Sequence, residues 1–129
     1  MRLRPAVLAL VFLPLLAAAA PAPPPAPDLR VVSVTSPNLD GGIVRVQVRN
    51  QGTAAAPASI LSVQLTGLQQ GTTSVSLKAL AVNETVIKDV QTGKLLSQVH
   101  FMVMADRGNH IPEPNEQNNY LSGQFGGKP

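Results

Sequence analysis

The chain has 129 residues, and its ten Lys and Arg against seven Asp and Glu give a formal net charge of +3. Hydrophobic residues make up 44% of it, but there is no Trp, one Tyr and three Phe. This length allows one domain, whose core must be built from Val, Leu, Ile and Ala. Because the sequence contains no Cys, a disulfide framework and a thiolate metal site are excluded.

The N-terminus has the layout of a secretory leader. Arg2 and Arg4 precede an apolar run over residues 6–16, which is followed by small residues. The run is shorter than the roughly 20 residues that span a bilayer, so we expect no stable membrane anchor after cleavage. A leader over residues 1–19, cut after Ala19, predicts a secreted or periplasmic protein.

Loss of the leader also removes most of the positive charge. Without Arg2 and Arg4 the formal net charge falls from +3 to +1, and no cluster of Lys and Arg remains. Nucleic-acid binding therefore lacks its electrostatic basis. The Pro-rich residues 20–27 that follow are expected to form an extended linker.

Residues 28–125 alternate between apolar and polar side chains with a period of two, which is typical of half-buried strands. The clearest segment is 42–50, where Val44, Val46 and Val48 share one face. A change of phase near Val31 predicts a bulge in the first strand. The other predicted strands are 28–36, 60–67, 72–80, 84–91, 97–105 and 119–125.

Turn-forming residues separate these segments, and the domain has about 100 residues. Seven short strands at this spacing predict an all-β fold, an immunoglobulin-like antiparallel β-sandwich. The Cys and Trp of antibody domains are absent from the sequence, so only the wider sandwich class is indicated. Residues 126–129 are expected to be a disordered C-terminus.

The sixth predicted strand has two apolar faces. One face carries Val99, Phe101, Val103 and Ala105, which we assign to the core. The other face carries Leu96, Gln98, His100, Met102 and Met104. This second face either packs under a loop or neighbouring strand, or forms a partner surface, since Met side chains adapt well to contacts.

Between the sixth and seventh strands lies a segment rich in acids and amides: Asp106, Asn109, Glu113, Glu116, Asn118 and Asn119. We interpret it as a structural corner, in which these side chains bind backbone N–H groups that no strand partner reaches. Pro114 at a first helical position, with Glu113 as a cap, also predicts one short helical turn.

Calcium is the alternative interpretation of the same segment. Asp106, Asn109, Glu113 and Glu116 offer the hard oxygen ligands that Ca²⁺ prefers. Their spacing does not fit an EF-hand loop, so a calcium site here would be irregular. The corner is the favoured interpretation, although the two can coexist, and no other cofactor is expected.

Enzymatic function is not expected. His100 and His110 are the only histidines in the sequence, and neither belongs to a triad motif or has zinc-ligand spacing. The carboxylates lie at a sandwich corner rather than across a cleft, which does not suit acid–base catalysis.

Several motifs together resemble the CARDB family of cell-adhesion-related modules in bacterial and archaeal surface proteins. They are Asp28–Leu29, the Asn50–Thr53 segment and the closing acid and amide segment described above. Where the family usually has a Pro-Gly turn, this chain has Val82–Asn83, and Asn83 can adopt a positive φ. The resemblance implies an immunoglobulin-like sandwich and an extracytoplasmic, non-enzymatic role, without naming a ligand.

We therefore expect a binding or scaffolding module that contacts an extracytoplasmic protein or a polysaccharide. Recognition would use exposed strand edges, by strand addition, or the loops at one end. Two alternatives remain open: a calcium-stabilised structural spacer, and an accessory or inhibitor of an envelope hydrolase.

Overall fold

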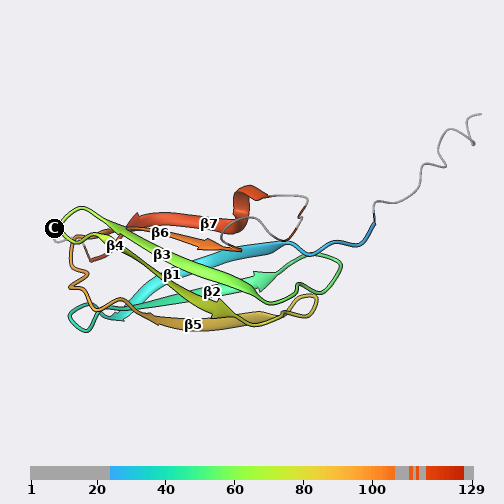
Figure 1. The fold of residues 1–129 in the computed structure, drawn as a ribbon, viewed down its shortest axis with the longest axis horizontal. Helices are drawn as coiled ribbons and strands as arrows, with labels where there is room; N and C mark the ends of the chain where they lie inside the picture. The colour runs from blue at the N-terminus through green and yellow to red at the C-terminus, as the bar shows by residue number, and fades with distance from the viewer. Residues whose placement is uncertain (1–23, 107–110, 112, 114–115, 127–129) are drawn as a thin grey trace, which may run out of the picture.

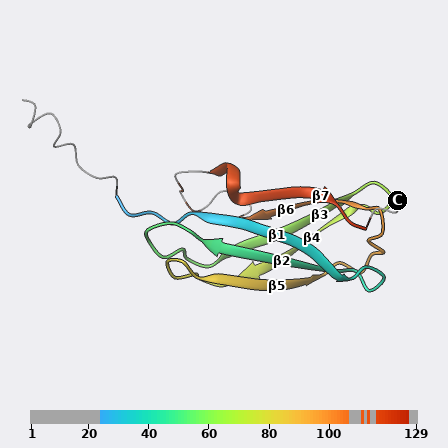
Figure 2. The same cartoon turned by 180° about the vertical axis from the view of Figure 1, so that it is seen from behind.

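The computed structural model describes residues 24–106, 111, 113 and 116–126, and the predicted leader lies outside them. The strands of the described residues are β1 (Leu29–Asn38), β2 (Ile43–Asn50), β3 (Ser59–Thr66), β4 (Gly71–Leu77), β5 (Thr85–Gln91), β6 (His100–Ala105) and β7 (Tyr120–Gln124). They run along the long axis of the molecule (Figures 1 and 2). All of their pairings are antiparallel.

These strands form two sheets, with the orders β1-β2-β5 and β4-β3-β6-β7. The predicted all-β sandwich is confirmed. In an immunoglobulin constant domain the fourth strand belongs to the sheet of the first, second and fifth strands. Here β4 instead pairs with β3, which makes the second sheet the larger one.

The alternation in β2 produces the centre of the first sheet. Val44, Val46 and Val48 are fully buried, while Arg45 and Arg49 on the other face are exposed. The predicted bulge in β1 is also confirmed, because the β1–β2 register shifts between Val31 and Ser33. Such a shift lets β1 bend while its neighbour stays regular.

The core lies between the two sheets and is mainly aliphatic. Its larger fully buried members include Leu29, Leu61, Leu77, Leu80 and Leu96. Phe101 and Phe125 stack near one end, with ring centroids 4.6 Å apart and ring planes inclined at 35°. Close packing of branched aliphatic side chains therefore replaces the aromatic core that this composition cannot supply.

One face assignment from the sequence was wrong. Leu96 was placed on the outer face of the sixth strand with His100, but it is fully buried in the core. The strand begins only at His100, because Gln98 takes a φ of 63° and the Val99 amide N–H donates to the Leu96 carbonyl in a turn. This turn resets the alternation before the strand starts.

The turn before β5 is as expected, with Asn83 at a φ of 67°. A short 3-10 helix, η2 (Glu116–Asn119), precedes β7 and lies beside β1 (Figure 1). A helical turn is thus present where one was predicted, whereas Pro114, its predicted first position, lies outside the described residues. None of the helical residues in the described part of the chain forms a helix long and apolar enough to cross a membrane.

Candidate functional site

Asn50, at the end of β2, holds together the end of the sandwich where the described chain begins. It is fully buried. Its Oδ1 accepts hydrogen bonds from the Asp28 amide at 3.1 Å and the Gly52 amide at 3.0 Å. Its Nδ2 donates to the carbonyls of Ala54 at 2.8 Å and Leu80 at 3.2 Å. One amide side chain thus joins three chain segments.

Gly52 allows the chain before β1 to pass close to this junction. A Cβ at this position would lie 2.3 Å from the Ala26 carbonyl oxygen and 2.6 Å from the Asp28 nitrogen. The same approach allows the Thr53 amide to donate to the Ala26 carbonyl at 2.9 Å. Because the obstacles are backbone atoms, a side chain here would displace the segment before β1.

Two of the predicted acids bind backbone N–H groups. Asp106 is 1% exposed, has a φ of 55°, and its Oδ2 accepts from the Ile111 amide at 2.9 Å. Glu113 Oε1 accepts from the Leu29 amide, also at 2.9 Å. Asp106 therefore closes the chain after β6 on itself, whereas Glu113 attaches the segment to β1.

The structure describes only some of the other predicted site residues. Asn118 is half-buried and Asn119 is 2% exposed, and both lie on η2. The backbone of Glu116 belongs to the same helix, but its side chain lies outside the description, as does all of Asn109. The structure thus gathers Asp106, Glu113 and the η2 amides at the end of the sandwich near the start of β1.

Sequence reasoning treated Asn50 only as part of a family motif and missed its role as the centre of this end. The available signal was an Asn directly after an alternating strand and followed by Gly52, since Asn in such a place bonds nearby backbone. Its bond to Leu80, 30 positions away, has no local signal.

Among the described residues, His100 and Asp106 do not form an acid–base pair. His100 and Asp106 lie at opposite ends of β6, which places their backbones about 20 Å apart at the usual rise per strand residue. No three His, Asp or Glu among the described residues come close enough to hold a metal ion.

A second feature is the outer face of the β4-β3-β6-β7 sheet, which we call the uncharged face. Register and alternation place its side chains in rows across the four strands. It consists of Thr72, Ser74, Ser76, Ile60, Ser62, Gln64, Thr66, His100, Met102, Met104, Tyr120, Ser122 and Gln124. None of these residues is Lys, Arg, Asp or Glu.

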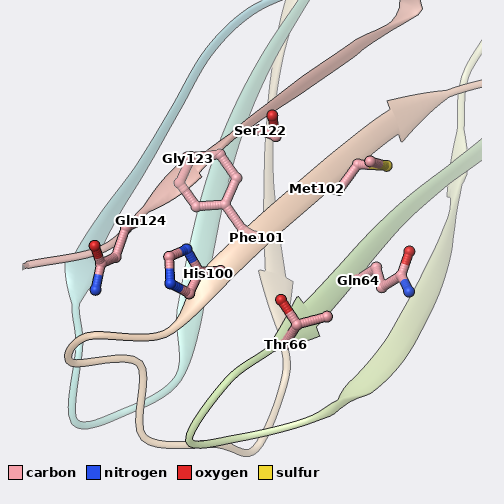
Figure 3. A pocket seen from close by; sticks show the side chains of 8 residues that line it. All are labelled: Gln64, Thr66, His100, Phe101, Met102, Ser122, Gly123 and Gln124. Atoms are coloured by element: carbon pink, nitrogen blue, oxygen red, sulfur yellow. The ribbon is translucent and has the colours of Figure 1, made fainter.

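An open groove of about 550 Å³ crosses this face. Figure 3 shows Gln64 and Thr66 on one side, His100 and Met102 on β6, and Ser122 and Gln124 on β7. Met102 is 38% exposed. Gly123 brings β7 close to Phe101, since a Cβ there would lie 2.9 Å from the Phe101 ring. The groove therefore combines an apolar floor with hydroxyl and amide walls.

The outer face of the β1-β2-β5 sheet has a different character. It carries Arg30 opposite Arg49, and Arg45 opposite Asp89. The Arg45 guanidinium donates to both Asp89 oxygens, at 2.8 and 3.0 Å. This hydrogen bonding lowers the pKa of the Asp89 carboxyl. The molecule thus has one charged sheet face and one uncharged sheet face.

Solved structures similar to this chain support the fold. A domain of a Methanosarcina acetivorans protein, provisionally described as a cell surface protein, has a TM-score of 0.59 at 24% identity, covering 75% of this chain and 88% of its own. The CARDB domain of a Pyrococcus furiosus protein, solved in complex with di-metal ions, has a TM-score of 0.55 at 21% identity, covering 81% and 97%. None of the curated proteins matches the sequence significantly.

The CARDB family model matches residues 26–123. This range contains Asn50, the acid and amide corner and nearly all of the uncharged face. The chain therefore belongs to the CARDB family, a family of non-catalytic, adhesion-related modules.

Proposed function

We propose that this chain is an exported interaction module that binds a protein or polysaccharide of the cell envelope through its uncharged face. The observation that carries the proposal is the groove over β3, β6 and β7, which Met102 helps to line. The hydrogen-bonded end around Asn50 and Asp106 then serves as scaffold, holding the strands that carry the groove.

The chemistry of the uncharged face suits recognition of an uncharged partner. Met102 and Met104 are flexible and polarisable, so they can adapt to a contact surface. The exposed Tyr120 ring offers rigid contact area, and the surrounding hydroxyl and amide groups offer adaptable hydrogen bonds, as in antibody binding sites. Depletion of charge is also the compositional mark of the centre of an interface.

Export rests on the sequence of the N-terminus and on the family. Residues 1–19 have the charge, apolar length and small-residue end of a leader. The similar Methanosarcina domain comes from a protein described in terms of the cell surface. A chain without cysteine is insensitive to the oxidising conditions outside the cytoplasm.

The test is retention of the purified chain on cells of its own source that lack its gene. Met102→Glu places a charge in the groove, and we expect retention to weaken by ~10-fold or more, the equivalent of one moderate interface contact. Ile87→Glu is the matched control, because Ile87 is 61% exposed at the middle of β5 on the charged face.

Two outcomes of this experiment would contradict the binding proposal. Equal retention of Met102→Glu and the unchanged chain would contradict the proposal, and so would a wild-type chain that the cells do not retain. Protease treatment of the cells beforehand then separates a protein partner, whose loss abolishes retention, from a polysaccharide.

A calcium-stabilised spacer is the second candidate. Asp28 Oδ1 and Asn118 Oδ1 are buried and have no hydrogen-bond partner in the described part of the chain. The similar Pyrococcus domain was solved with two metal ions. Ca²⁺ takes six to eight oxygens, more than these two atoms supply, so an ion at this corner would also need the predicted ligands, Glu113 among them.

Thermal melting with calcium and with a chelator tests this candidate. A calcium site predicts a higher midpoint with calcium, and a loss of that shift in Glu113→Gln, which keeps an acceptor for the Leu29 amide but removes the charge. If the melting midpoint is the same with calcium and with the chelator, calcium does not stabilise this chain.

A further inference from the structure

The edges of the two sheets differ in how they are protected. β1 and β5 are the edges of the first sheet, and β4 and β7 are the edges of the second. An edge strand presents unpaired N–H and C=O groups to any extended segment that comes near. Proteins usually block this pairing with charges, Pro, bulges or very short strands.

Three of these edges carry such a device. β1 has two register shifts and contains Pro37. β5 carries Lys88 on the same face as Val86 and Val90, so a charged side chain points toward the sandwich interior. β7 has only five residues and lies beside β1.

The fourth edge, β4, lies beside β5 as β7 lies beside β1, but it has no charge, Pro or bulge and is longer than β7. Its seven residues, GTTSVSL, contain no charge and no Pro, and they pair with β3 in an unbroken register. Three of its central residues are Thr or Val, which favour extended backbone. Val75 is only half-buried although it packs on the core, so a further strand at this edge would cover it.

We propose that β4 pairs with β4 of a second copy of this chain, antiparallel and with Ser74 opposite Ser74. This register centres the two-fold axis on the middle of the strand and uses its whole length. It places Thr72 opposite Ser76 of the partner subunit, a pair whose hydroxyl groups suit neighbouring strands. Because the strand is uncharged, no like charges face each other within it.

The charges at the ends of β4 are compatible with a second copy. The Lys94 side chain lies beside Gly71, at the start of the strand. Glu84 lies near the other end, where it pairs with Lys78, the residue after Leu77. Antiparallel pairing brings the Lys94 end of each copy to the Lys78–Glu84 end of the other, so Lys94 meets an ion pair and not an isolated cation.

The assembly closes at two copies. A two-fold interface uses the same strand from both molecules, so no β4 edge remains free after pairing. The resulting eight-stranded sheet ends at β7 on both sides, an edge that is short and lies beside β1. The two uncharged faces become neighbours on one continuous surface.

Sedimentation of the chain, expressed from its own first residue, tests the pairing. We expect a dimer that dissociates on dilution. Val75→Lys gives β4 an inward charge like that of Lys88 on β5. We expect it to raise the dimer dissociation constant by ~10-fold or more, the change that corresponds to the loss of one interface contact. Val86→Lys makes the same change at a half-buried inward position of β5 and should leave the dimer unchanged, with circular dichroism confirming that both variants fold.

A single cysteine tests the register directly, because the described chain has none of its own. Ser74→Cys should form a disulfide-linked dimer under mild oxidation. Ser76→Cys is the matched control on the same strand. Position 76 lies two residues from the two-fold axis in each copy, on opposite sides of it. The two cysteines would therefore be ~14 Å apart along the strands, beyond the reach of a disulfide.

A monomer at every concentration, dissociation by Val86→Lys rather than Val75→Lys, or equal crosslinking at 74 and 76 would overturn this assignment. The result is independent of the proposed partner binding. Met102 lies in the groove, away from the edge of β4, so Met102→Glu should lose envelope retention and still dimerise.

Discussion

Asn50 is the residue on which the scaffold end depends most. Its buried side-chain amide makes four hydrogen bonds within the described part of the chain, all to backbone atoms, and so satisfies donors and acceptors that water cannot reach. Asn50 contributes to stability mainly because its removal would leave buried backbone donors and acceptors without hydrogen-bond partners. The same logic applies to Asp106, whose carboxylate accepts the Ile111 amide.

Replacement of Asn50 by Ala should therefore destabilise the fold strongly. We expect a loss of ~3 kcal/mol in the free energy of unfolding, at the upper end for buried groups left unpaired, measured by urea denaturation. Asn38→Ala is the control, since the Asn38 side chain accepts from the exposed Gly41 amide at 2.9 Å, and its loss should cost less than ~1 kcal/mol. Similar losses of unfolding free energy in both variants would show that the buried bonds of Asn50 do not stabilise the fold more than an exposed cap does.

At the level of elements, alternation was enough to predict every strand of the described residues, because most inward positions, Lys88 of β5 aside, are apolar. It failed at Leu96, where the positive φ of Gln98 reset the phase. It also could not assign β4 to a sheet, since that depends on pairing with β3 rather than on its own pattern.

The candidate site was less predictable than the strands. The outer positions of β6 were identified from the sequence, as was the adaptability of Met102 and Met104. The groove itself was not, because β3, β6 and β7 are distant in sequence and form it only through their register. The role of Asn50 was missed for the same reason, as its partners come from separate segments.

The Arg45–Asp89 pair between β2 and β5 gives a prediction about pH. The pKa of Asp89 is lowered in the folded state, so its contribution to stability is present above its ordinary value near 4 and lost as the pH falls through the lowered value. The urea midpoint of the unchanged chain should slightly exceed that of Asp89→Asn at neutral pH. The difference should be small, because the pair is exposed.

Acid and salt provide the checks on that prediction. The difference in midpoint should vanish at low pH, where Asp89 is protonated in both folded and unfolded chains. It should also shrink at high salt, which screens exposed charges. A difference that grows on acidification would contradict the assigned direction of the shift.

At the level of the whole molecule, the two sheets differ in the chemistry of their outer faces. The first sheet carries charge on its outer face, where Arg30, Arg45 and Arg49 remain exposed. The second carries the uncharged face, the groove and the unprotected β4 edge. The acid and amide corner connects the sheets by tying Glu113 to β1, which makes it part of the frame that holds the groove.

Methyl NMR tests the central proposal, binding through the uncharged face, most directly. The sequence has three Met residues, and cleavage of the predicted leader would leave only Met102 and Met104, both on that face. On addition of an isolated envelope fraction, the account predicts that both Met methyl signals shift or broaden while the Ile87 methyl signals on the charged face stay unchanged. Unchanged Met signals, or a change confined to Ile87, would contradict it.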